Sequence, residues 1–133
     1  MKETELWSLL RQKIPGHLIR IENLVTKGVP DVHCCYQGKH TWLELKIASG
    51  NYVYFQSSQI AFMAEVIKHK ENMKVLMRKK ELIYVINPNV IINSCKTEQK
   101  NDKVQIEIKN LSSASIWGQP WRWDEIIKEV YSL

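Results

Sequence analysis

The chain is 133 residues long, 44% of its residues are hydrophobic and 25% are charged, and its formal net charge is +5. This length and composition are typical of one compact domain that buries a core, so we expect a single domain over residues 1–133. Three cysteines, two of them adjacent, exclude a disulfide framework, and no apolar stretch is long enough to cross a bilayer. The chain is therefore predicted to be soluble, intracellular and cytoplasmic, without a membrane partner, and its basic balance favours a polyanionic partner.

Hydrophobic periodicity and turn residues divide the chain into helices and strands. The predicted elements, in chain order, are a helix over 4–13, strands over 17–22, 32–36 and 39–47, a helix over 58–71, strands over 74–78, 82–86 and 104–108, and a helix over 124–131. Residues 48–51 are predicted to form a loop, and Ser57 or Ser58 to be the N-cap of the second helix. The polar segment 96–103 is expected to be an exposed loop.

The order of these elements predicts an α/β fold, with a mixed central sheet flanked by helices. The second helix joins two strands, and a strand–helix–strand crossover favours parallel neighbours. The core is expected over about residues 3–86, and a strand and helix over about residues 87–133 would be added to it. The candidate site described next would lie at one edge of the sheet.

The strongest candidates for catalytic residues are a pair of acids on neighbouring predicted strands. Gln37 and Gly38 form a two-residue turn, and the register set by this turn places Asp31 opposite Glu44. Directly opposed residues share one face of a sheet, with Cβ atoms about 5 Å apart. Lys46, two positions after Glu44, points to the same face. Three ionisable groups therefore converge, unless the register slips by one residue and sends Asp31 to the other face.

Two carboxylates at this separation repel one another unless one holds a proton or a cation lies between them. Mg²⁺ suits them, because it binds through one or two carboxylates and keeps waters and phosphate oxygens as further ligands, and we expect Mn²⁺ to substitute for it. The ion would polarise a phosphodiester and acidify a bound water, while Lys46 would orient that water or stabilise the developing charge. The alternative is an ordinary hairpin with a solvated Glu-Lys face.

The order of the motifs extends this pattern. The stretches Gly28-Val29-Pro30-Asp31 and Leu43-Glu44-Leu45-Lys46 together resemble the PD-(D/E)XK nuclease superfamily, and most of all the virus-type replication-repair nuclease (VRR-NUC) domains and the Holliday-junction resolvases. Further positions that match those domains are Asn23, Gly28, Gly50 and Gln59, together with Glu5 as an additional acid on the first helix. The resemblance covers about residues 3–86, and the chain after residue 87 matches no motif of the family.

The resemblance implies a restriction-endonuclease-like core and a set of site residues. These are Asp31, Glu44 and the Leu45 carbonyl as metal ligands, Lys46 as the catalytic lysine, Gln59 as a group that steadies this lysine or the water, and Glu5 as support for a second ion or an outer shell. Two alternatives stay open. Glu5 would merely complement the helix dipole, and Gln59 would merely face solvent.

The predicted function is that of a Mg²⁺-dependent endodeoxyribonuclease that hydrolyses phosphodiester bonds, with branched DNA such as a Holliday junction as the preferred substrate. Symmetric cutting of a junction needs two sites, which predicts a homodimer. The residues predicted to contact DNA are Lys13, Arg20, Asn23, Lys27, Ser49 and Asn51. The alternatives are a restriction- or repair-type nuclease of the same fold and a nucleic-acid binding module with structural acids. Whether the gene is cellular, viral or from a phage stays open.

Two other motifs have competing interpretations. His33-Cys34-Cys35 contains zinc-ligand types, but strand alternation places the two cysteines on opposite faces, which disfavours zinc. Trp117, Trp121 and Trp123 could stack on unpaired bases at a DNA branch point. We favour packing of the last helix against the core, because tryptophan is above all a large apolar side chain.

Overall fold

The computed structural model describes residues 2–22, 25–95 and 102–133. A six-stranded sheet has the order β1-β2-β3-β5-β6-β8, and β4 pairs with β7 in a separate two-stranded ribbon. The strands are β1 (His17–Arg20), β2 (Val32–Tyr36), β3 (Lys39–Ala48), β4 (Tyr52–Gln56), β5 (Met73–Lys79), β6 (Leu82–Ile86), β7 (Lys103–Glu107) and β8 (Ser115–Trp117). The helices are α1 (Glu3–Lys13), α2 (Ser57–Lys68), α3 (Pro88–Asn93), α4 (Trp123–Tyr131) and the short 3-10 helix η1 (Ile108–Leu111). No helix within these ranges is long and apolar enough to span a membrane.

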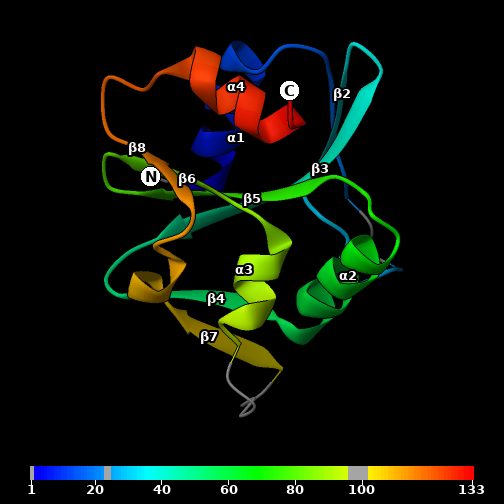
Figure 1. Ribbon diagram of the computed structural model, residues 1–133, viewed down its shortest axis with the longest axis vertical. Coiled ribbons are helices and arrows are strands. Elements are labelled where there is room, and N and C mark those ends of the chain that lie inside the picture. Colours follow the sequence, from blue (N-terminus) through cyan, green and yellow to red (C-terminus); the bar gives the residue numbers. More distant parts are fainter. Residues whose placement is uncertain (1, 23–24, 96–101) are drawn as a thin grey trace.

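The sheet separates two hydrophobic cores. Helices α1 and α4 cover one face, and α2, α3 and the β4–β7 ribbon lie on the other side (Figure 1). Leu10 and Leu45 belong to the core under α1 and α4, whereas Phe55, Met63 and Val75 belong to the opposite core. Burial of apolar surface on both faces of one sheet accounts for the layered α/β arrangement that the sequence predicts.

Strands β3 and β5 are parallel neighbours, as the sequence predicts, and the crossover that joins them contains both β4 and α2. All other neighbours in the large sheet are antiparallel, so the sheet is mixed. Strand β3 is third in the order and lies between β2 and β5. The expectation of a site at one edge of the sheet is therefore wrong, because strands are added on both sides of β3.

The sequence prediction misses two strands, β4 and β8, and one short helix, α3. Strand β4 occupies nearly all of the segment between the predicted loop and the predicted second helix, and its partner β7 lies about fifty residues later. The N-cap of α2 is Gln56 and not Ser57 or Ser58. Helix α3 begins with Pro88 at a position where proline is well tolerated, since the first helical amide has no intrahelical partner. Strand β8 pairs with β6 and closes the far side of the sheet.

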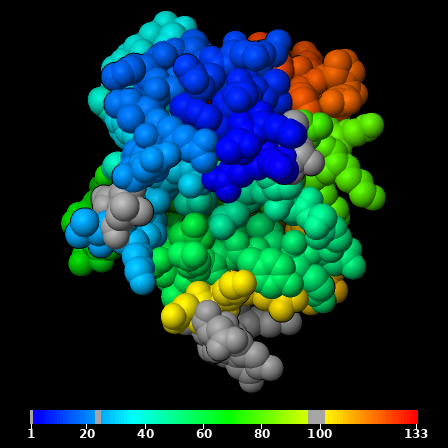
Figure 2. Space-filling model, turned by 180° about the vertical axis from the view of Figure 1, so that it is seen from behind, coloured from blue at the N-terminus to red at the C-terminus, as the bar shows by residue number. Residues whose placement is uncertain are grey.

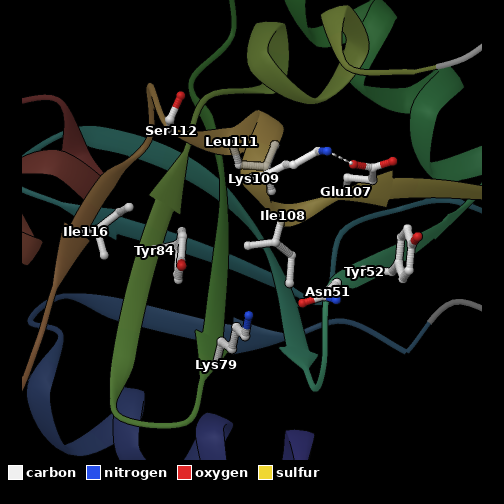
Figure 3. Close-up of a pocket in the computed structure, with 10 residues that line it drawn as sticks. All are labelled: Asn51, Tyr52, Lys79, Tyr84, Glu107, Ile108, Lys109, Leu111, Ser112 and Ile116. Carbon is white, nitrogen blue, oxygen red and sulfur yellow. Dashed lines mark ion pairs between the residues drawn. The ribbon is translucent and has the colours of Figure 1, made fainter.

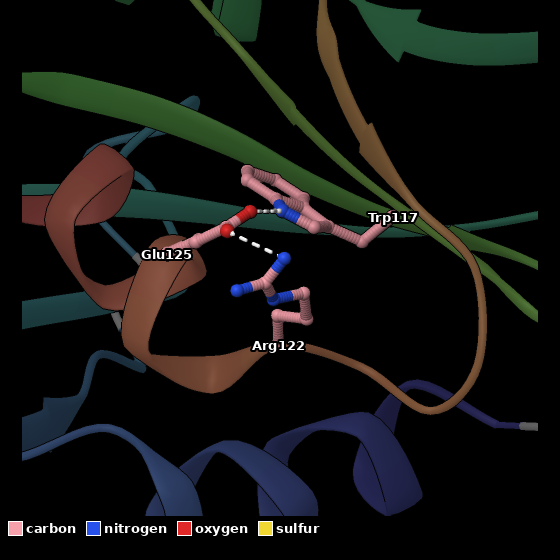
Figure 4. Close-up of polar contacts among 3 residues, drawn as sticks. All are labelled: Trp117, Arg122 and Glu125. Carbon is pink, nitrogen blue, oxygen red and sulfur yellow. Dashed lines mark hydrogen bonds and ion pairs between the residues drawn. The ribbon is translucent and has the colours of Figure 1, made fainter.

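The C-terminal tryptophans pack against the protein. Trp117, Trp121 and Trp123 are all partly buried against the core under α1 and α4. The Trp117 indole nitrogen donates a 3.0 Å hydrogen bond to Glu125, which also pairs with Arg122 at 3.2 Å (Figure 4). The Trp121 indole nitrogen donates to the backbone oxygen of residue 81 at 2.8 Å. These contacts support the packing interpretation of the cluster.

Candidate active site

A tight turn fixes the register of the hairpin that carries the two acids. Gln37 and Gly38 have positive φ values of 52° and 79°, as a two-residue hairpin turn of type I′ requires. Tyr36 pairs with Lys39, and this register continues along β2 and β3 as far as Val32, which pairs with Leu43. The next pair in the same register is Asp31 with Glu44. The predicted register of the hairpin is confirmed.

Asp31 and Glu44 lie in contact. Their carboxyl groups are close enough to share a hydrogen bond, and Oδ2 of Asp31 accepts a 2.8 Å hydrogen bond from the backbone nitrogen of Leu45. Glu44 is only 2% exposed, and its Oε2 is buried and has no hydrogen-bond partner among the described residues. A buried carboxyl oxygen without a donor is costly unless it holds a proton or binds a cation.

The protonation of this site follows from its burial. Burial raises the pKa of Glu44, and the neighbouring Asp31 carboxyl raises it further, because a second negative charge beside the first is unfavourable. Burial lowers the pKa of the Lys46 amine, although the surrounding carboxyl groups oppose this effect. Without a cation, Glu44 therefore favours its protonated form, and a bound cation would compete with that proton.

Lys46 and Glu44 are linked through one side chain on α2. The Lys46 ammonium donates to Oε1 of Gln59 at 3.1 Å, and Nε2 of Gln59 donates to Oε1 of Glu44 at 3.3 Å. The backbone nitrogen of Gln56 also donates to Oε1 of Gln59, at 2.9 Å, as part of the capping box that begins α2. The Lys46 ammonium lies 4.7 Å from the centre of the Phe55 ring. Gln59 is therefore fixed between the lysine and the acid and is not a free surface glutamine.

The first helix brings a different acid to the site than the sequence suggests. Glu5 is exposed, and its carboxylate accepts a hydrogen bond from the backbone nitrogen of Lys2 at the start of α1. Glu3 instead lies within hydrogen-bonding distance of Asp31, and burial and Asp31 raise its pKa. The structure thus joins Glu3, and not Glu5, to the acid pair. We call Glu3, Asp31 and Glu44 the acidic site.

Helix geometry explains why Glu3 and not Glu5 reaches the sheet. Residues three and seven positions after Glu3 are Leu6 and Leu10, which are both fully buried. Residues at this spacing share one face of a helix, so Glu3 lies on the buried face. Glu5 is two positions away from Glu3, which turns it by about 200° around the helix axis. The phase of the leucines is the sequence signal that would have identified Glu3.

A glycine brings the loop before Asp31 against α2. Gly28 has a φ of +86°, and a Cβ atom built there would collide with the backbone oxygen of Ser58. Only glycine combines this conformation with so close an approach. Lys27 is beside it and lines a depression of about 400 Å³ together with Ser57 and Lys103. The loop is therefore held at the end of α2 that carries Gln59.

The residues predicted to contact DNA are distributed unevenly around the acidic site. Arg20 is close enough to Glu3 to offset part of the rise in its pKa, whereas Lys13 lies at the other end of α1, about 15 Å from the helix start. Ser49 and Asn51 follow β3, and Asn51 lines a different cavity. Asn23 lies outside the described residues.

Three segments that are far apart in the sequence meet at the acidic site. Figure 2 shows the start of the chain in dark blue, the segment after β1 in light blue and the region of β3 and β4 in cyan to green, adjoining one another on the back of the molecule. Glu3, Asp31 and Glu44 come from these three segments. The site therefore depends on the tertiary fold and not on one local motif.

The residues present fit a hard divalent cation. Two carboxyl groups in contact, one with an unpartnered oxygen, are ligands that Mg²⁺ accepts together with waters. The Leu45 amide points toward Asp31. In a strand, the carbonyl of a residue points to the same side as its amide, so the Leu45 carbonyl oxygen also lies on the side of β3 that faces Asp31. No three His, Cys, Asp or Glu side chains in the described ranges are grouped so as to hold an ion alone. A bound Mg²⁺ would thus need ligands beyond the side chains.

The adjacent cysteines point in opposite directions, as strand alternation predicts. Cys34 is fully buried and its thiol donates to the Thr41 backbone oxygen at 3.5 Å. Cys35 is on the other face, where its sulfur lies 3.7 Å from Nε2 of His40. His33 shares that face, with its ring centre 5.3 Å from the His40 ring. The two thiols therefore do not converge on one point.

Comparison with known proteins identifies the fold. No family model matches the chain, and no curated protein matches its sequence. The structure is similar to that of Hjc, a Holliday junction resolvase from the archaeal hyperthermophile Archaeoglobus fulgidus, with a TM-score of 0.60 and 12% sequence identity. The similarity covers 86% of this chain and 91% of Hjc. The predicted fold class is confirmed: a mixed sheet flanked by helices, matching a resolvase and restriction-endonuclease-like fold.

Proposed function

We propose that the protein is a divalent-metal-dependent endodeoxyribonuclease. The observation that carries this proposal is the contact between the Asp31 and Glu44 carboxyl groups, with one buried oxygen of Glu44 lacking a hydrogen-bond donor among the described residues. Such an oxygen is expensive to bury without a proton or a cation. Lys46 and Gln59 adjoin it in a connected hydrogen-bond network, which holds a candidate proton donor beside the acid pair.

Each residue has a distinct part in the proposed reaction. Asp31, Glu44 and the Leu45 carbonyl would hold Mg²⁺, or Mn²⁺ in its place, and a bound ion would supply polarisation of the phosphate and a more acidic water. Gln59 holds the Lys46 ammonium beside the acids. Lys46 orients the attacking water and, because burial lowers its pKa, exchanges a proton with that water more readily than an exposed lysine would. Glu3 supports the site through Asp31.

Branched DNA is the proposed substrate class. Two findings support it: the structural similarity to Hjc, which is described as a Holliday junction resolvase, and the order of motifs that resembles PD-(D/E)XK nucleases, including VRR-NUC domains. The net charge of +5 favours a polyanion and predicts binding that weakens with salt. One chain offers one acidic site, so symmetric cutting of a four-way junction would require a homodimer.

A nucleic-acid binding module without catalysis is the second candidate. It is favoured by the near-complete burial of Glu44, because a carboxyl group that holds a proton can serve as a structural hydrogen-bonding group. The fold would then be retained while the acids have lost contact with metal. The two candidates differ in their dependence on a divalent ion.

The test is a cleavage panel with the purified protein and Mg²⁺ or Mn²⁺. Four-way junction, flap, single-stranded and linear duplex DNA of identical sequence are compared. Asp31→Asn and Glu44→Gln should abolish cleavage yet leave DNA binding equal or tighter, since acids that face phosphates repel them. Glu5→Gln is the matched control, because Glu5 is an exposed acid on the same helix as Glu3 but outside the acidic site. If no DNA is cut by wild type with either metal while binding persists, the binding module is correct.

A further inference from the structure

A second cavity lies apart from the acidic site, beyond the end of β3. It has a volume of about 640 Å³ and is bounded by the start of β4, the ends of β5 and β7, β6, η1 and β8. Its wall combines Asn51, which follows β3, with Lys79 at the end of β5 (Figure 3). The volume is within the range of about 300–1,000 Å³ that is usual for small-molecule sites.

The cavity has an apolar and aromatic wall. Ile108 and Leu111 of η1 are almost fully buried and contribute to its lining, and Ile116 of β8 is 43% exposed at its border. Tyr84 on β6 is 7% exposed, and Tyr52 at the start of β4 is 39% exposed. Figure 3 shows Tyr84 and Ile116 on one side of the cavity, and Tyr52, Asn51 and Ile108 on the other. A planar ring could therefore lie against tyrosine and aliphatic side chains.

The charges around the cavity leave one cation uncompensated. Lys109 pairs with Glu107 at 3.0 Å, and both line the cavity. Lys79 has no ion pair within the described parts of the chain, and Figure 3 shows its amine directed toward the space between the two sides. Asn51 offers an amide that can both donate and accept hydrogen bonds, and Ser112 offers a hydroxyl. The cavity therefore suits a planar, hydrogen-bonding ligand with a negative group.

We propose that this cavity binds a nucleotide, with its base against Tyr52 and the apolar wall and its phosphate near Lys79. A base has a π-face for tyrosine and an edge for the Asn51 amide, and a phosphate compensates the lysine charge. Two sources offer this chemistry: an unpaired nucleotide of a DNA strand and a free deoxynucleoside monophosphate. The first source rests on the proposed function, because Asn51 follows the strand that carries Glu44 and Lys46.

Binding can be measured with a fluorescent base and without metal, so that no DNA is cut. The full chain in EDTA is titrated into three probes that contain 2-aminopurine: the free deoxynucleoside monophosphate, a duplex with the base in an unpaired bulge, and the same base fully paired. The probes report stacking through saturable loss of fluorescence. Tyr52→Ala and Lys79→Gln are the test variants. Tyr54→Ala and Lys80→Gln are the matched controls, because each is an exposed residue of the same type close in sequence and outside the cavity wall.

We expect wild type to bind the bulged base or the free nucleotide, and the paired base at least tenfold more weakly. Tyr52→Ala and Lys79→Gln should each weaken binding about tenfold, and the controls less than twofold. If the bulged base binds more tightly than the monophosphate, the natural ligand is an unpaired nucleotide of a DNA strand. If the monophosphate binds as tightly as the bulged base, the natural ligand is a free nucleotide. The proposal is overturned if neither probe saturates, or if the controls weaken binding as much as the test variants. Because EDTA removes cleavage from this assay, a nucleotide site that persists in a protein that cuts no DNA would overturn the proposed function alone.

Discussion

Replacing Glu44 with glutamine should stabilise the metal-free protein at neutral pH while abolishing cleavage. In wild type, this 2% exposed carboxyl group lies against the Asp31 carboxyl, and its Oε2 has no donor among the described residues. Glutamine has nearly the same shape, carries no charge, and can donate a hydrogen bond from its amide to Asp31. The substitution therefore removes the proton uptake that folding of wild type requires at this carboxyl group, and it leaves the packing in place.

The magnitude follows from the shifted protonation of Glu44. Its pKa is raised in the folded state above an ordinary value of 4.5, so folding takes up a proton as the pH rises above that value. Stability that is present in full below the ordinary pKa is therefore lost as the pH rises toward the raised pKa. At about pH 7.5, about three units above the ordinary value, the loss approaches about 4 kcal/mol at about 1.4 kcal/mol per unit. Relaxation around the site lowers this figure, and we expect a gain of about 2–4 kcal/mol for the variant.

Urea unfolding in EDTA, followed by tryptophan fluorescence, measures this gain. It should be about 2–4 kcal/mol at about pH 7.5 and below about 1 kcal/mol at about pH 5, because that pH is only about half a unit above the ordinary pKa of the carboxyl group. Mg²⁺ should stabilise wild type and leave Glu44→Gln unchanged, because only the wild-type pair binds the ion. An equal gain in stability at both pH values, or no gain at the higher pH, would refute the conclusion that folding raises the pKa of Glu44.

Three further substitutions test separate parts of the site. Glu3→Gln should lower the affinity for Mg²⁺ at least threefold, as measured from the rise in melting temperature with Mg²⁺ concentration. Glu5→Gln should leave this affinity unchanged. The reverse result would assign the supporting role to Glu5. Lys46→Gln should lower single-turnover cleavage by about 10²–10⁴-fold with DNA binding, measured by gel shift, changed less than twofold, and a parallel loss of binding would contradict a role in catalysis. Gly28→Ala should destabilise the fold by about 1–3 kcal/mol in urea, because its Cβ would collide with Ser58 in a left-handed conformation, and an unchanged midpoint would contradict that close approach.

The hairpin that carries the acids was accessible from sequence because its determinants are local. Gln37 and Gly38 select a two-residue turn, and a turn of known length sets the register of the strands it joins. Alternation then places Glu44 and Lys46 on one face. The sequence predicts the strand over Leu82–Ile86 with its observed bounds for a similar reason, since a turn and a proline delimit it.

Other elements depend on partners that the sequence does not place. Val53 of β4 pairs with Ile106 of β7, more than fifty residues later, and neither strand is stable without the other. The identity of the helix acid depends on the phase of α1, which the leucines reveal once the helix is laid against the sheet. The burial of Glu44 depends on how α2 and the β4–β7 ribbon cover the sheet, which no local pattern determines.

We propose that the Asp31 and Glu44 carboxyl groups share one divalent ion. A crystal structure with Mn²⁺ tests this proposal, because the anomalous scattering of Mn²⁺ locates the metal. We expect one anomalous peak with metal–oxygen distances of about 2.0–2.3 Å to both carboxyl groups and to the Leu45 carbonyl. A peak elsewhere on the protein, or none at saturating Mn²⁺ with the two carboxyl groups still in contact, would contradict it.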